Sequence, residues 1–230
     1  MPERLCAPGL DEGLQRRAGG AAGFFVFARC YTGGMGGPSS TRRPATYEDL
    51  LAVPDHLVAE ILDGEVYTSP RPAVPYAIAT GGLSTNVIAA FDWGRGGPGG
   101  WWILVEPELH LAQDVLVPDI AGWRRARVPD LPRGAFLEIA PDWVCETVSP
   151  STERIDRGKK QAIYAREGVA HLWMLNPIAE TLEAYRLEHG RWSLLVTHAG
   201  DVNASIEPFD AVELELWRLW GKSMPSAAIE

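Results

Sequence analysis

The sequence predicts one α/β domain in which helices cover the faces of a central mixed sheet. Helical and strand-like segments follow one another in the order helix, hairpin, helix, strands, helix, strands, which is typical of such layered domains. Hydrophobic residues make up 46% of the chain and charged residues 22%, as in an ordinary globular protein. With 230 residues, the chain is long enough to enclose one sizeable core.

The chain divides into an extension, a domain and a tail. Residues 1–44 are rich in glycine, alanine and arginine and show neither a helical nor a strand period, so we expect a disordered extension. Residues 45–221 carry the domain, and residues 222–230 form the tail. A short helix should open the domain, because Thr46 and Asp49 fit a capping box with Asp49 in place of the usual glutamate.

A hairpin and a second helix are expected next. Strand-like runs over residues 57–62 and 65–68 flank Asp63-Gly64, which is a strong signal for a two-residue turn. The helix is expected over residues 76–92, and it should end before the glycine-rich loop of residues 94–100.

The second half of the chain supplies most of the sheet. A helix is expected there with Ser151 or Thr152 as its N-cap, and Gly168 supplies the left-handed residue that ends it after residue 167. The remaining predicted elements are strands over residues 101–111, 115–123, 142–148, 170–176, 181–187 and 191–198.

Charge and cysteine content limit the function. A formal net charge of −9 excludes a generally basic nucleic-acid clamp, so a polyanion would have to be held by a local basic patch or by metal ions. The three cysteines, Cys6, Cys30 and Cys145, suit neither a disulfide framework nor a zinc site. We therefore expect a cytoplasmic protein. We expect no membrane association either, because no apolar run reaches the length of a span.

Three charged features stand out against this background. Asp119 and Glu146 each interrupt an apolar, strand-like run, where an unpaired charge is unfavourable. The pair Lys159-Lys160 lies on the helix that directly follows the second run. Two carboxylates on adjacent strands can share Mg²⁺, and a nearby lysine can stabilise developing negative charge. Taken singly, each of these residues is more typical of a turn, a cap or a solvated face.

The order of motifs along the chain resembles the Uma-two family, whose members are restriction-endonuclease-like proteins of the PD-(D/E)xK superfamily. The resemblance covers about residues 45–220. It is carried by Glu60-Ile61-Leu62-Asp63-Gly64-Glu65, Val117-Pro118-Asp119-Ile120, Glu146-Thr147-Val148-Ser149-Pro150-Ser151-Thr152, Asp156-Arg157-Gly158-Lys159-Lys160, Tyr164, Gly168-Val169 and Leu172-Trp173.

The resemblance implies roles for individual residues. Asp119 and Glu146 would bind Mg²⁺ or Mn²⁺, and Glu60 would be an accessory catalytic acid. Lys160 would be the catalytic lysine, with Lys159 as the alternative register. Tyr164, one helical turn beyond Lys160, would either contact substrate or pack.

Two positions depart from the family pattern. The superfamily usually places a lysine two residues after the second acid, and this chain has Val148 there. The family commonly has a histidine near the start of the second helix, and this chain has Tyr76.

The resulting hypothesis is a metal-dependent endonuclease that hydrolyses phosphodiester bonds in DNA. A homodimer is a further expectation, because two strands are usually cut by two sites. The alternatives are a catalytically inactive module with the same fold and a nuclease acting on RNA. Five arginines are candidate contacts to the nucleic-acid backbone, although each taken singly is more typical of the surface: Arg124, Arg125, Arg127, Arg154 and Arg157.

Overall fold

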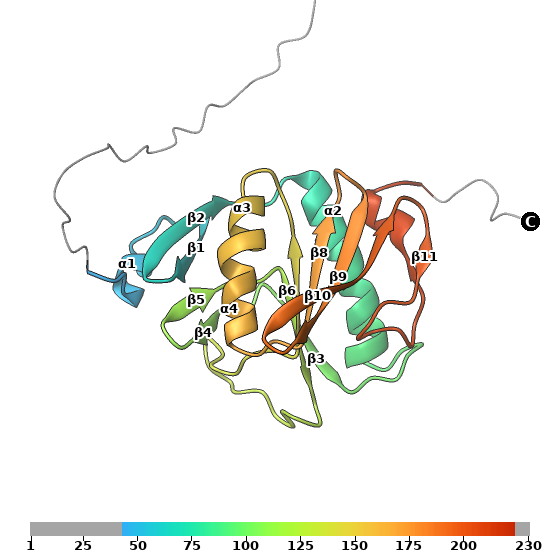
Figure 1. Cartoon of the computed structure of the whole chain (residues 1–230), viewed down its shortest axis with the longest axis horizontal. Coiled ribbons are helices and arrows are strands. Elements are labelled where there is room, and N and C mark those ends of the chain that lie inside the picture. Colours follow the sequence, from blue (N-terminus) through green and yellow to red (C-terminus); the bar gives the residue numbers. More distant parts are fainter. Residues whose placement is uncertain (1–42, 224–230) are drawn as a thin grey trace, which may run out of the picture. The chain divides into compact units, whose positions relative to one another are not determined.

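The computed structural model describes residues 43–223 (Figure 1). Most of the predicted disordered extension, residues 1–42, and most of the predicted tail, residues 224–230, lie outside these residues. A six-stranded mixed sheet forms the centre of the domain, in the order β10-β9-β8-β7-β6-β3. Its strands are β3 (Trp101–Val105), β6 (Ile120–Arg124), β7 (Trp143–Thr147), β8 (His171–Asn176), β9 (Thr181–Glu188) and β10 (Arg191–Ala199).

A second sheet of four strands has the order β2-β1-β5-β4, and two short strands pair near the C-terminal end. The four strands are β1 (Leu57–Leu62), β2 (Glu65–Pro70), β4 (Leu109–Leu111) and β5 (Asp114–Leu116). The short pair is β11 (Asn203–Ala204) and β12 (Leu214–Glu215).

Between residues 43 and 223, three helical regions accompany the sheets, besides the 3₁₀ turn η3 (Leu216–Trp220). Helix α1 (Tyr47–Leu51) opens the domain, and α2 (Val74–Val87) continues into a π-helical turn, η1 (Ile88–Asp92). The third region is a run of consecutive helical turns, α3 (Glu153–Ile155), the π-helical turn η2 (Asp156–Lys160) and α4 (Gln161–Arg166).

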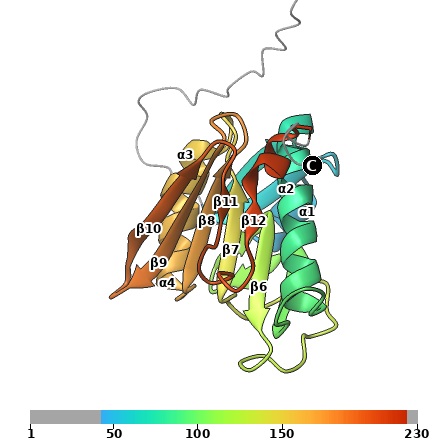
Figure 2. The same ribbon diagram turned by 90° about the vertical axis from the view of Figure 1, so that its right-hand side faces the viewer.

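The six-stranded sheet has a hydrophobic core on each face, because successive side chains of a strand point to opposite sides. In β7, Trp143 and Cys145 pack with α2 and the C-terminal segment. Val144, between them, packs with α4 and the smaller sheet. Figure 2 shows α2 and α4 on opposite sides of the sheet. Glu146 is two residues after Val144, so the alternation of side chains along β7 places it on the α4 side as well.

Most sequence expectations are confirmed. The hairpin turns at Asp63 and Gly64, both of which have positive φ. The backbone N–H of Thr46 donates to Asp49 Oδ2 at 2.8 Å, as a capping box requires. Thr152 is the N-cap of the helix before Gly168, which adopts φ +76°.

The prediction of single strands over residues 101–111 and 115–123 is wrong. Each run breaks in the middle and contributes one strand to each sheet. The breaks fall at Pro107 and Pro118, which lack the N–H that a continuing ladder would need. The two crossings lie together, since Glu106 N–H donates to the Asp119 carbonyl at 3.0 Å. Asp119 thus sits where the chain passes from one sheet to the other.

Within residues 43–223, one helical segment, Val74–Asp92, is long and apolar enough to cross a membrane by length and composition, with a mean hydropathy of 1.2. This finding differs from the expectation that no apolar run reaches the length of a span. The buried side chains of this segment, including Ala79, Leu83 and Val87, belong to the core on one face of the sheet. Core helices of soluble proteins meet the same criterion, so this is weak evidence for a span.

Candidate active site

The pairing of β6 with β7 brings the two predicted metal ligands together. Ile120 lies opposite Cys145 in this antiparallel pair, so one step further along the register places Asp119 opposite Glu146. The backbone N–H of Thr147 donates to Asp119 Oδ2 at 2.6 Å and fixes that carboxylate at the end of the sheet. Two acids that are 27 positions apart in the sequence thereby share one end of the sheet.

The helix after β7 delivers the lysine. Its π-helical turn, η2, carries both Asp156 and Lys160, whose exposed fractions are only 5% and 3%. Lys160 Nζ lies 2.9 Å from Glu146 Oε1 and 3.9 Å from Asp156 Oδ1. Single π-helical turns are rare and are found frequently at functional sites. No signal in the sequence indicated this turn.

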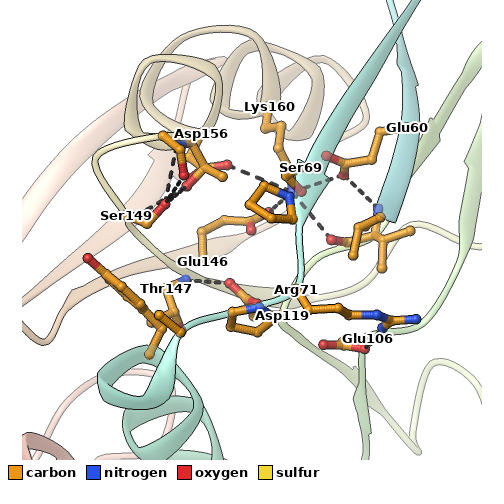
Figure 3. A pocket seen from close by; sticks show the side chains of 18 of the residues that line it. Glu60, Ser69, Arg71, Glu106, Asp119, Glu146, Thr147, Ser149, Asp156 and Lys160 are labelled. Atoms are coloured by element: carbon orange, nitrogen blue, oxygen red, sulfur yellow. Dashed lines mark hydrogen bonds and ion pairs between the residues drawn. The ribbon is translucent and has the colours of Figure 1, made fainter. Parts of the chain in front are cut away.

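The smaller sheet contributes the fourth acid. Glu60, on β1, accepts a hydrogen bond from the Val117 backbone N–H at 2.8 Å through Oε1. The same oxygen lies 3.0 Å from Lys160 Nζ. Figure 3 shows Glu60, Glu146 and Asp156 approaching Lys160 from different sides. The amine is therefore held by acids from both sheets and from its own helix.

Burial shapes the electrostatics of this cluster. It raises the pKa of Asp119 to about 6, against the lowering effects of the Thr147 N–H and the Lys160 charge. Burial also raises the pKa of Glu146 well above its usual range, and it raises that of Asp156. Burial alone would lower the pKa of Lys160, but the surrounding acidic groups, first among them Glu146 and Glu60, together outweigh it and raise that pKa well above normal.

Four carboxylates facing one ammonium leave an excess of negative charge when all are ionised. Such a cluster must take up protons or attract a further cation. Its acids line an open pocket of about 300 Å³ (Figure 3). The remaining walls come from the β2–α2 loop, the turn after β7 and the crossings between the sheets, and include Ser69, Arg71, Tyr76, Glu106, Ser149 and Thr152.

The donor set fits a divalent cation that keeps several waters. In the described part of the chain, no preformed group of three or more histidine, cysteine or acidic residues has the spacing of a complete metal cage. Hydrogen bonds and ion pairs within residues 43–223 engage Asp119 Oδ2 and Glu146 Oε1 but not the second oxygen of either carboxylate. Mg²⁺ is commonly held by one or two carboxylates together with water and substrate phosphate.

Comparison with known proteins agrees with this picture. The family model of Uma2, described as "Putative restriction endonuclease", matches residues 44–217. The chain belongs to the Uma2 family. No curated protein matches it significantly.

A crystal structure of "a putative nuclease belonging to DUF820" from Anabaena variabilis has a similar fold, with a TM-score of 0.63. The two proteins share 19% sequence identity, and the match covers 77% of this chain and 98% of that one. At this identity the likeness shows the fold. The restriction endonuclease-like α/β fold predicted from the sequence is thus confirmed.

The two departures from the Uma2 pattern have clear positions in the structure. Val148, where the superfamily usually has its lysine, is 1% exposed and packs in the core on the α4 side. Lys160 reaches the acids from the helix instead. Tyr76, where Uma2 proteins commonly have a histidine, lines the pocket near the start of α2.

The two residues predicted to bind substrate do not line this pocket. Lys159 points to the surface, where its amine lies 3.4 Å from Asp63 and 3.5 Å from Glu65. Tyr164 is fully buried, and its hydroxyl donates to Glu146 Oε1 at 2.5 Å. This placement favours packing over substrate contact for Tyr164, and it favours Lys160 over Lys159 as the lysine of the site.

The five arginines considered as backbone contacts also lie outside the pocket. Arg125 pairs with Asp92, Arg127 with Asp142, and Arg157 with Glu183. Arg124 stacks over a tryptophan ring, and Arg154 borders a different depression with Lys159. Conversely, Asp156, Arg71 and Glu106 line the pocket without having been predicted from the sequence. Only Asp156 had a signal, since it precedes Lys160 by four residues on a helix.

Proposed function

We propose that this Uma2 protein is a Mg²⁺- or Mn²⁺-dependent endonuclease that hydrolyses DNA phosphodiester bonds at the pocket of Asp119 and Glu146. The observation that carries the proposal is the position of the Lys160 amine, 2.9 Å from Glu146 and 3.0 Å from Glu60. Two acids from neighbouring strands and an amine from the next helix therefore converge on one open pocket. The family description and the fold of the neighbour support a nuclease.

The protein's own residues would divide the work as follows. The second carboxylate oxygens of Asp119 and Glu146 would hold the cation, which supplies Lewis-acid activation of water and neutralises charge on the phosphoryl group. Lys160 would stabilise the negative charge that develops on the phosphate oxygens. Glu60, fixed by the Val117 N–H, would hold the Lys160 amine in place. Tyr164 would orient Glu146 through its hydroxyl.

An inactive module with this fold is the rival function. A module without catalytic function does not need this cluster, because an ammonium and four carboxylates are costly to desolvate. The burial of the Lys160 ammonium together with three of these acids, Glu60, Glu146 and Asp156, beside an open pocket therefore favours the enzyme.

Plasmid cleavage tests the proposal. Supercoiled DNA is incubated with Mg²⁺, with Mn²⁺ and with EDTA, using wild-type protein and the variants Asp119→Ala and Lys160→Ala. We expect cleavage by wild-type protein with metal and none by either variant. Lys159→Ala is the matched control, because it removes the same charge from the neighbouring position outside the pocket and should keep activity. Cleavage that persists in Asp119→Ala and Lys160→Ala would point to a contaminant and contradict the proposal. A parallel incubation with RNA decides between the two nucleic acids.

A further inference from the structure

The pocket has many acids and few cations. Within the described residues, its lining includes five carboxylates and two cations, Arg71 and Lys160. The Lys160 side chain is 4% exposed and is engaged by Glu60 and Glu146. The Arg71 side chain is 60% exposed. Arg71 is therefore the cation of this lining that an incoming anion meets first.

Arg71 is held only loosely in the structure. Its Nη1 lies 3.5 Å from Glu106 Oε2, and the Glu106 side chain is itself 39% exposed. An ion pair so long and so accessible to water contributes little to stability. A phosphate can accept two parallel hydrogen bonds from a guanidinium, which makes a stronger contact than this single one. A substrate phosphate can thus take Arg71 from Glu106.

Glu106 is the fixed partner of the pair. It adopts φ +48°, a left-handed conformation that is unfavourable for a residue with a side chain and persists only where the surroundings enforce it. Its backbone N–H is bound to the Asp119 carbonyl at 3.0 Å. Arg71, by contrast, lies on the loop between β2 and α2, so its side chain is the one free to move.

The pair also stands between two hollows. Arg71, Glu106, Val58 and Val117 line the pocket of the acids, and the same four residues line a neighbouring depression of about 300 Å³ beside α1. Figure 3 shows the Arg71 side chain extending towards Glu106 in the region of Asp119. A chain of nucleotides that continues from the pocket into the depression must pass Arg71.

We propose that Arg71 binds a phosphate of the DNA next to the scissile one, and that Glu106 competes with this phosphate for the arginine and opposes anion entry until Arg71 moves from Glu106 to the phosphate. This inference rests on the proposed function. It makes Arg71 a substrate-binding residue and Glu106 a negative regulator of affinity, although the two form one ion pair.

Steady-state cleavage of a short DNA duplex carrying a fluorophore and a quencher tests this, with Mg²⁺ and five proteins. Arg71→Ala should raise KM about tenfold with kcat within about twofold, the loss of one charge-assisted phosphate contact. Arg71→Lys should fall between Arg71→Ala and wild type. Glu106→Gln should lower KM about threefold, because the arginine is released and a repelling charge is removed. Arg95→Ala removes the same charge from an exposed site outside the pocket and should leave KM unchanged.

The decisive result is that KM changes in opposite directions in Arg71→Ala and Glu106→Gln. If the pair only braced the loop, removing either partner would change KM in the same direction. An unchanged KM in Arg71→Ala, or a raised KM in Glu106→Gln, with wild-type protein still cleaving, would overturn the inference and leave the proposed function intact. Absence of cleavage by wild-type protein would refute the proposed function and this inference with it.

Discussion

Replacing Asp119 by asparagine should stabilise the metal-free protein at alkaline pH. Burial raises the pKa of Asp119 to about 6 from an ordinary value near 3.8, so ionising this carboxyl opposes folding. A shift of about two units corresponds to roughly 3 kcal/mol at 1.36 kcal/mol per unit, before screening by the pocket's solvent. We therefore expect Asp119→Asn to raise the free energy of unfolding by about 2 kcal/mol at pH 8. The asparagine oxygen can still accept the Thr147 N–H.

The sign of the pH dependence follows from the same shift. The folded-state pKa is raised, so the favourable contribution of the protonated carboxyl is fully present below about pH 4. It is lost as pH rises through 6. The stability difference between Asp119→Asn and wild type should thus be near zero at pH 4 and should grow to its full value by pH 8.

Urea unfolding in EDTA at pH 4, 6 and 8 measures this difference. Asp130→Asn is the matched control, because it removes one charge from an exposed loop and should change stability equally little at each pH. Adding Mn²⁺ at pH 8 should stabilise wild type and not Asp119→Asn, since ligand binding to the folded state adds to stability. If Asp119→Asn were less stable than wild type at pH 8 without metal, the reasoning that ionised Asp119 opposes folding would be refuted.

Two further changes test the cluster from other sides. Lys160→Met should lower the free energy of unfolding by about 3–5 kcal/mol at pH 8, because it leaves four acids without their cation. The loss of stability should shrink at pH 5, because the acids take up protons. Urea unfolding measures it, and Lys159→Met is the control that should change stability little. Equal losses in the two variants would contradict the prediction. Tyr164→Phe removes the donor to Glu146 Oε1 and should weaken Mn²⁺ binding about tenfold in calorimetry. Unchanged Mn²⁺ affinity in Tyr164→Phe would show that the hydroxyl serves packing alone.

Local signals in the sequence were sufficient wherever a few neighbouring residues decide the conformation. The turn at Asp63-Gly64 and the end of the helix at Gly168 need positive φ. Glycine and the Asp-Gly pair favour that conformation, so the sequence alone predicts both features. Pro107 and Pro118 interrupt their apolar runs, but a proline alone does not show that the chain changes sheets there. An apolar run interrupted by one proline looks like an edge strand, and only the second sheet shows that the chain crosses between sheets there.

The site divides in the same way. The sequence by itself determined which residue types stand at Asp119, Glu146 and Lys160, and the family resemblance joined them into one hypothesis. Only the tertiary structure decided which lysine belongs to the site, because the packing of this helix against both sheets buries Lys160 beside Glu146 and leaves Lys159 next to Asp63. It also decided that Asp156 and Glu106 join the pocket and that five arginines do not. The physical reason is that charge interactions depend on distances between elements far apart in the chain, and sequence spacing fixes distance only within one element.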